Sequence, residues 1–129
     1  MSILFLVKRI QKKVAVKNMQ RATKQKERED EILEKIIELL VRELEPTRIY
    51  LFGSRAKGKA HKGSDFDIAI DGVQPDDAFL RKMRGEIEGF SGLYTIDIVF
   101  LSELNKQFRE LILETGKIIY DAKGSSIFN

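Results

Sequence analysis

The stretch GSRAKGKAHKGSDFD, residues 53–67, carries most of the information about fold and chemistry in this chain. It begins with Gly53 and Ser54, directly after a β-type run, and ends with two aspartates, Asp65 and Asp67. Glycine lets a backbone approach a bound group closely, and serine offers a hydroxyl and an N–H to a phosphate oxygen. The stretch therefore predicts a turn between two strands that can bind a phosphate.

Acidic and basic side chains surround this turn in the sequence. Asp65 and Asp67 stand two residues apart, which places both carboxylates on one face of a strand predicted over Asp65–Asp71. A third acid, Asp97, interrupts the most hydrophobic predicted strand, Tyr94–Leu101, where a buried carboxylate needs compensation. The loop also supplies a positive field for a polyanion through four cations: Arg55, Lys57, Lys59 and Lys62.

Three carboxylates beside a phosphate-binding turn favour a magnesium–triphosphate site. Mg²⁺ is usually held by one or two carboxylates together with substrate phosphates, and two such ions can clamp a phosphoryl displacement. In this hypothesis Asp65 and Asp67 hold the metal, and Asp97 binds one ion and accepts the proton of the acceptor hydroxyl. Taken singly, a Gly-Ser pair is typical of an ordinary turn and an Asp-X-Asp pair of a solvated strand. We expect Asp71 and His61 to be solvated.

The rest of the chain predicts further helices and strands. Periodic apolar residues indicate a first helix over residues 29–44, ended by Pro46, and a strand follows over Arg48–Phe52. The helix could begin earlier, because Arg21–Arg28 holds no helix breaker. The remaining signals are a helix capped by Asp76 or Asp77 and ended by Gly89 and Gly92, a helix capped by Ser102 and ended by Gly116, and a strand over Lys117–Tyr120. We therefore expect an α/β (α+β) fold with a small mixed sheet of three or four strands and helices mainly on one side.

Composition excludes several classes of site. The chain has 129 residues, no cysteine and one histidine, which excludes a disulfide framework, a thiolate zinc site, a cysteine nucleophile and a multi-histidine metal centre. The apolar run near the start, residues 3–7, is far shorter than a membrane span and is not followed by a cleavage site. We expect a cytoplasmic protein with no membrane partner.

The charge is divided unevenly along the chain. Residues 1–28 hold nine Lys/Arg and one acid, whereas residues 29–129 carry a net charge of −5. A basic arm can bind nucleic acid or an anionic surface, but charge runs are usually solvated, so we expect nucleic-acid binding to be weak at most. The arm is then a solvated helical extension, or results from a start codon assigned upstream of Met19. The expected organisation is a basic extension (1–28), a catalytic domain (29–121) and a tail (122–129).

The loop and its acids resemble the signature of the DNA polymerase β superfamily of nucleotidyltransferases: Gly-Ser, ten residues, then Asp-X-Asp. Arg55, Gly58 and Ser64 also fit the flanking pattern of the minimal nucleotidyltransferases, the MNT-domain proteins. In that family a third carboxylate lies on a later strand, where Asp97 stands here. The resemblance covers residues 29–120 and implies the polymerase β palm-like nucleotidyltransferase fold.

The resemblance also implies an activity. Members bind a nucleoside triphosphate with Mg²⁺, commonly two ions, and transfer the nucleotidyl group to a hydroxyl with release of pyrophosphate. It implies catalytic and metal-binding roles for Asp65, Asp67 and Asp97, and contacts to ATP from Gly53, Ser54, Arg55 and Ser64. Minimal members are commonly encoded beside a HEPN protein as antitoxins, and some transfer AMP from ATP to a tyrosine of the toxin. ATP as the substrate rests on this resemblance alone.

Two alternatives stay open. The acceptor could be a small-molecule hydroxyl, or the chain could be a non-catalytic module that neutralises a toxin by binding it. The core is short for a deep small-molecule pocket, which favours an acceptor on another chain or a pocket formed between copies of this one.

Overall fold

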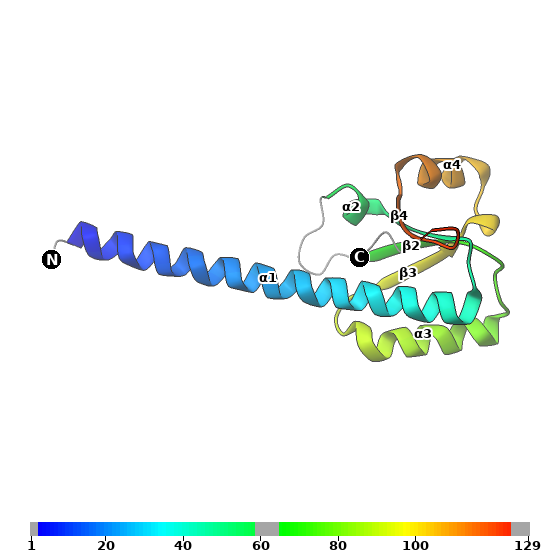
Figure 1. The fold of residues 1–129 in the computed structure, drawn as a ribbon, viewed down its shortest axis with the longest axis horizontal. Helices are drawn as coiled ribbons and strands as arrows, with labels where there is room; N and C mark the ends of the chain where they lie inside the picture. The colour runs from blue at the N-terminus through cyan, green and yellow to red at the C-terminus, as the bar shows by residue number, and fades with distance from the viewer. Residues whose placement is uncertain (1–2, 59–64, 125–129) are drawn as a thin grey trace. The chain divides into compact units, whose positions relative to one another are not determined.

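The computed structural model describes residues 3–58 and 65–124 of the chain (Figure 1). The elements follow the order α1 (Ile3–Leu44), β1 (Arg48–Phe52), α2 (Gly53–Ala56), β2 (Phe66–Asp71), α3 (Asp77–Ser91), β3 (Ile96–Phe100), the 3₁₀ turn η1 (Leu101–Glu103), α4 (Lys106–Thr115) and β4 (Lys117–Asp121). The chain divides into two compact units, residues 1–33 and 34–129.

The first unit is helical. Its described residues belong to α1, which begins at Ile3 rather than near residue 29 because no glycine or proline interrupts the sequence from there to Leu44. The helix ends as predicted before Pro46, with Glu45 in a left-handed conformation (φ 47°). Of the described helices, none is long and apolar enough to cross a membrane. The expected domain limits at residues 28 and 121 stay a prediction.

The second unit is built on a four-stranded mixed sheet with the order β3-β2-β1-β4. β1 pairs antiparallel with β2 and β4, whereas β2 pairs parallel with β3. The predicted mixed sheet is therefore confirmed. The antiparallel register sets Phe52, the last residue of β1, opposite Asp67. The parallel register sets β3 alongside β2 with β3 at the sheet edge, although residues 72–95 separate the two strands in the sequence.

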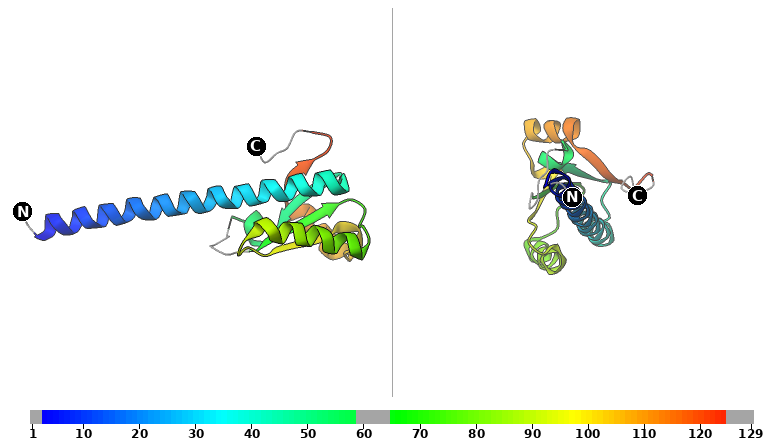
Figure 2. Two further views of the ribbon diagram at one scale, coloured as in Figure 1. Left: turned by 90° about the horizontal axis from the view of Figure 1, so that it is seen from below. Right: turned by 90° about the vertical axis from the view of Figure 1, so that its left-hand side faces the viewer.

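Helices cover both faces of this sheet, with α3 on one side and α4 on the other (Figures 1 and 2). The C-terminal part of α1 shares the face of α3, and the Arg42 guanidinium lies 3.6 Å from the Glu86 carboxylate of that helix. Two of the three longer helices thus share one face, as expected. The core of this unit is made by apolar residues that include Ile36, Leu40, Ile49, Phe66, Ile68, Ile70, Met83 and Ile87.

A smaller apolar core lies on the α4 face of the sheet and buries part of β2. Alternation along β2 directs Ala69 to the same side as Asp67, and Ala69 is fully buried against Tyr50, Leu101 and Ile112. The alternation of acids with apolar residues over Asp65–Asp71 predicts that this whole face of the strand is solvent-exposed. That expectation is wrong in the middle of the strand, because α4 covers it there, and it holds only towards the two ends.

The helix boundaries confirm three predicted end residues, with Gly116 ending α4, and correct two others. Asp76 caps α3, since its carboxylate accepts a hydrogen bond of 2.8 Å from the Phe79 N–H. Gly89 lies inside α3, and only Gly92, with φ 63°, ends the helix. Ser102 does not cap a helix because it lies within η1. Asn105 takes that role at α4, accepting a hydrogen bond of 2.8 Å from the Phe108 N–H.

Candidate active site

Gly53 and Asp67 meet where β1 ends and β2 begins. Gly53 has a φ of +70°, a conformation that disfavours residues with a side chain. A β-carbon added at this position would collide with the Asp67 carboxylate oxygen and would lie 3.2 Å from its Cγ. Glycine is therefore required here twice, by the backbone conformation and by the close approach of Asp67. The sequence-predicted turn and the second acid of the pair are in direct contact.

Asp67 and Asp97 are neighbours across the parallel strands. The register pairs Asp67 of β2 with Asp97 of β3, and paired residues of adjacent strands project from the same face of a sheet. Asp97 is exposed because β3 is an edge strand, so our argument that its carboxylate must be compensated for burial is wrong. What distinguishes Asp97 is its position beside Asp67, which the strand register supplies.

Asp65 completes the acidic group. It is exposed, directly precedes β2 and lies two residues before Asp67. Burial, followed by the charges of Asp97 and Asp65, raises the pKa of Asp67 above its usual value, and Arg55 lowers it by less. Asp65 and Asp97 are thus close enough for their charges to act on Asp67. Together they disfavour a further negative charge at Asp67 and favour a bound cation.

Arg55 links the short helix α2 to the start of β2. Its Nε donates a hydrogen bond of 3.2 Å to the Asp65 carbonyl oxygen. Its guanidinium carbon lies 3.9 Å from the ring centre of Phe66 and 5.7 Å from that of Tyr94, and the two rings pack edge to face. Phe66 and Tyr94 thereby help to position a cation beside the acids. Our sequence reasoning missed this role, for which the aromatic residues flanking the acids were the available signal.

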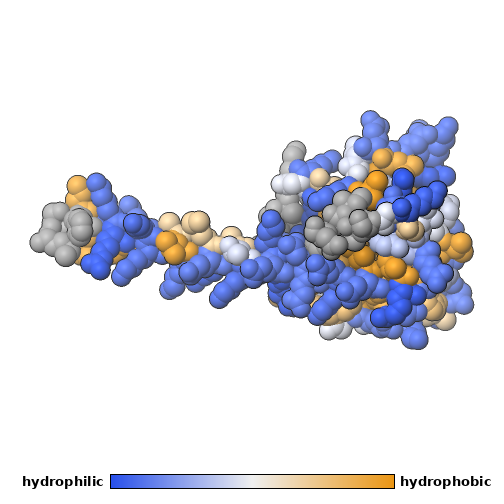
Figure 3. Space-filling view, in the orientation of Figure 1, coloured by the Kyte–Doolittle hydropathy of each residue, from blue (hydrophilic) through white to orange (hydrophobic). Residues whose placement is uncertain are grey.

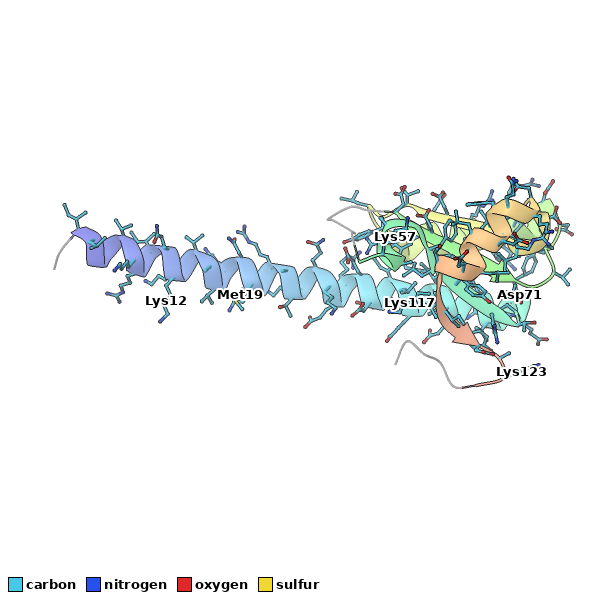
Figure 4. All side chains as sticks on the ribbon, turned by 90° about the horizontal axis from the view of Figure 1, so that it is seen from above. Lys12, Met19, Lys57, Asp71, Lys117 and Lys123 are labelled. Carbon is cyan, nitrogen blue, oxygen red and sulfur yellow. The ribbon has the colours of Figure 1, made fainter. Side chains whose placement is uncertain are left out.

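The other predicted residues are placed as follows. Ser54 is exposed in α2, and Lys57 is exposed just after it. Asp71 lies at the far end of β2 from Asp67, and Figure 4 shows the labelled Lys57 and Asp71 well apart. Four predicted residues lie outside the described part of the chain: Lys59, His61, Lys62 and Ser64.

The acidic group fits Mg²⁺ by its chemistry. Among residues 3–58 and 65–124, no three histidine or acidic side chains are already gathered as a ligand set. Mg²⁺ rarely uses such a protein cage; it is bound by one or two carboxylates and completes its shell with phosphate oxygens and water. The carboxylates of Asp67 and Asp97, adjacent in register, are hard oxygen donors of this type. The raised pKa of Asp67 is the electrostatic condition that a divalent cation relieves.

Comparison with known proteins agrees with this geometry. Residues 34–124 match the family model described as polymerase beta, nucleotidyltransferase. This chain belongs to the polymerase beta nucleotidyltransferase family. The predicted resemblance, and with it the expectation of a nucleotidyltransferase enzyme, is therefore confirmed at the level of the family. The match contains the whole candidate site, from Gly53 to Asp97, and leaves the first 33 residues outside.

Relatives of this nucleotidyltransferase include a curated protein of Haemophilus influenzae described as probable protein adenylyltransferase MntA. It is 33% identical over 88 residues, which are 67% of this chain and 77% of the relative. A crystal structure of a toxin–antitoxin with AMP-PNP matches with a TM-score of 0.59 and 26% identity, over 70% of this chain and 73% of the other. A structure of a tri-AMPylated Shewanella oneidensis HEPN toxin with MNT antitoxin shares the fold, with a TM-score of 0.53, 23% identity and 70% of each chain covered.

Proposed function

We propose that this nucleotidyltransferase uses Mg²⁺ and ATP to transfer AMP to a hydroxyl of a partner protein, and that it is the antitoxin of a HEPN-type toxin. One observation carries the catalytic part: the register of Asp67 with Asp97, beside a glycine turn that contacts Asp67. The description of the Haemophilus influenzae relative as a probable protein adenylyltransferase supports a protein acceptor. The toxin–antitoxin complexes among the similar structures support the partner class.

Asp65, Asp67 and Asp97 are the proposed metal ligands. Mg²⁺ at these carboxylates would neutralise charge on the triphosphate and on the leaving pyrophosphate. The protein's own contribution is to hold the acids side by side on the neighbouring strands β2 and β3, with Asp65 just before β2, before substrate arrives. β1 and Gly53 fix Asp67 from one side, and β3 fixes Asp97 from the other. Such positioning lowers the cost of assembling several negative groups around the reacting phosphate.

Asp97 is the proposed acceptor of the hydroxyl proton. Its side chain is exposed on the edge strand, whereas Asp67 is partly covered. A hydroxyl on a second macromolecule can therefore reach Asp97 from solvent without entering a deep pocket. This exposure favours a protein acceptor over a small molecule, which needs an enclosing pocket for affinity.

The nucleotide phosphates are proposed to lie at Gly53, Ser54, Arg55 and Ser64. Gly53 is half-buried, with the Asp67 carboxylate in the space that a side chain would fill, and Ser54 is exposed beside it. The guanidinium of Arg55 keeps a positive charge next to the acids through its contacts with Phe66 and the Asp65 carbonyl. An anchored cation of this kind can offset phosphate charge without a large entropic cost on binding.

The deciding experiment follows label from α-labelled ATP, with Mg²⁺, in lysate of the source organism. Wild type is compared with Asp65→Asn/Asp67→Asn, with Asp71→Asn as a matched control on the same face of β2, and with excess EDTA. We expect a labelled protein band with wild type and Asp71→Asn only, and its mass identifies the target. Label in small molecules alone would replace the protein acceptor by a small-molecule one.

Protection separates catalysis from neutralisation by binding. Co-expressed with the labelled target, wild type should relieve its toxicity and Asp65→Asn/Asp67→Asn should not. Protection retained by the double variant, together with no label transfer by wild type, would contradict the enzymatic proposal and leave a toxin-binding module.

A further inference from the structure

The first unit carries an unusual concentration of exposed apolar residues. Among the described residues, thirteen large hydrophobic side chains are exposed, and eight of them lie within residues 3–19. Residues 1–28 also hold nine of the chain's cations against one acid. Figure 3 shows apolar and hydrophilic surface alternating along this helix. Neither the family match, which begins at residue 34, nor the proposed catalysis gives this segment a role.

Except at position 5, the apolar and basic residues are segregated over the first turns of the helix. Ile3, Val7, Ile10 and Val14 follow a four-three-four spacing and so form one stripe, with exposed fractions from 43% to 82%. The rest of the circumference carries the cations Lys8, Arg9, Lys12 and Lys13. Val16 and Met19 lie off the stripe, and the labelled Met19 projects on the same side of the helix as Lys12 in Figure 4. The amphipathic segment is therefore residues 3–14.

We propose that residues 3–14 bind the surface of anionic phospholipid membranes, with the stripe at the lipid boundary and the cations at the headgroups. Interfacial helices combine these two features, an apolar face and a Lys/Arg-rich polar face, and they do not span the bilayer. This agrees with the absence of a spanning helix among the described residues. It differs from our expectation of no membrane partner, which set aside an anionic surface for the basic arm because charge runs are usually solvated.

A second copy of the chain fits this segment less well. The next two positions of the stripe are Lys17 and Arg21, so the apolar repeat stops after two heptads, short of what a coiled coil needs. Two copies side by side would also bring together two helices with a large excess of positive charge. Negative charge must come from elsewhere, and an anionic bilayer supplies it together with an apolar phase.

Nucleic acid fits less well because it uses only half of the pattern. Phosphates would neutralise the cations but would leave Val7, Ile10 and Val14 in water. Proteins that bind single-stranded nucleic acid stack its bases on aromatic residues interleaved with the basic ones. No aromatic residue lies between Lys8 and Lys17. The proposal is independent of the catalytic site, so its failure leaves the proposed function untouched.

The test is flotation of the full chain with vesicles of phosphatidylcholine alone or with about one third phosphatidylserine. We expect binding to the anionic vesicles only. Neutralising three cations in Lys8→Gln/Lys12→Gln/Lys13→Gln should weaken it about a hundredfold, since each cation contributes roughly fivefold near an anionic surface. Breaking the stripe in Val7→Asn/Ile10→Asn/Val14→Asn keeps the charge and should weaken binding by at least about tenfold.

Matched controls separate the stripe from general surface hydrophobicity. Val73→Asn/Leu93→Asn/Leu113→Asn makes the same chemical change at three exposed apolar positions of the second unit and should bind like wild type. Circular dichroism and unfolding midpoints check that every variant is folded.

Three results would overturn the proposal. The first is no flotation of wild type with anionic vesicles, including the case in which an oligonucleotide duplex or an acidic protein binds the arm instead. The second is undiminished flotation of the stripe variant, which would reduce the interaction to charge alone. The third is a stripe-dependent dimer, seen by sedimentation, that does not bind vesicles.

Discussion

The two ends of the β1–β2 strand pair have opposite effects on the charged side chains that they carry. At one end, Arg48 of β1 lies 3.2 Å from the Asp121 carboxylate of β4, and hydrogen bonding to Tyr50 and the charge of Asp121 raise the pKa of Arg48. At the other end, burial and two neighbouring carboxylates raise the pKa of Asp67. The fold stabilises the charged form of Arg48 and penalises the charged form of Asp67.

This difference distinguishes a structural charge from a functional one. A partly covered acid with other acids as neighbours does not stabilise the fold. Such an arrangement therefore favours a site that binds a ligand. The Arg48–Asp121 pair needs no further group. Each prediction below perturbs one end of the strand pair and uses the other end, or a matched position, for comparison.

The largest expected difference between the two ends is in catalysis. Asp67→Asn should lower the rate of nucleotidyl transfer by about a hundredfold or more, because it removes a proposed metal ligand from the reacting group. Asp121→Asn makes the same chemical change at the opposite end and should leave the rate within about twofold of wild type. Steady-state transfer to the labelled target measures both. Equal losses of transfer rate in the two variants would show that the two ends do not differ in their role in catalysis.

The next effect concerns the turn that holds Asp67. Gly53→Ala should destabilise the fold by about 1–3 kcal/mol, because the new methyl group meets the Asp67 carboxylate and the left-handed backbone is strained. Gly58→Ala is the matched control: φ is +68°, but a methyl group there meets no atom of the described residues within 4 Å. It isolates the backbone strain. Denaturant unfolding measures the free energy of unfolding of both variants, and the difference between their losses is the cost of the contact with Asp67. Equal losses would mean that the Asp67 side chain moves aside without cost.

The sequence predicts the local parts of the site well. Gly53 and the Asp65-X-Asp67 pair belong to adjacent strands joined by one turn, so spacing and alternation place them correctly. The mixed sheet follows from element order in the same way. Local competition between caps is harder: Ser102 and Asn105 both suit a helix start, and the 3₁₀ turn at Leu101–Glu103 decides for Asn105.

The parts that the sequence does not predict depend on long-range register. Asp97 meets Asp67 only through the parallel pairing of β2 and β3, and the sequence does not reveal that β3 is an edge strand that exposes Asp97. Ala69 gives the converse case, since α4 buries a face that alternation alone assigns to solvent. The stacking of Arg55 on Phe66 and Tyr94 likewise joins three separate segments.

A smaller effect is expected at the structural end. Asp121→Asn should lower the unfolding midpoint by no more than a few degrees, because a partly exposed ion pair contributes little. The Arg48 side chain is 42% exposed, so high salt should screen the pair and reduce the difference from wild type. Thermal unfolding at low and high salt tests this. A large, salt-independent loss would show that this end is part of the core.

The smallest effect is a pH dependence at the functional end, and its sign is fixed by the direction of the pKa shift. The folded protein raises the pKa of Asp67, so it binds a proton there more tightly than the unfolded chain does. Stability is therefore lost as pH rises from about 4, the usual aspartate pKa, through the raised value. Asp67→Asn removes this penalty and should unfold at a slightly higher temperature than wild type at pH 7.

Both proteins should unfold at the same temperature well below pH 4, where Asp67 is neutral in both states. Taking the difference between variant and wild type cancels the titration of the other groups. Adding Mg²⁺ with ATP at pH 7 should raise the wild-type midpoint and reverse the order, because a ligand that binds the folded state stabilises it by mass action. A variant less stable than wild type at pH 7 without ligand would mean that the Asp67 charge is compensated within the fold, and the contrast between the two ends would disappear.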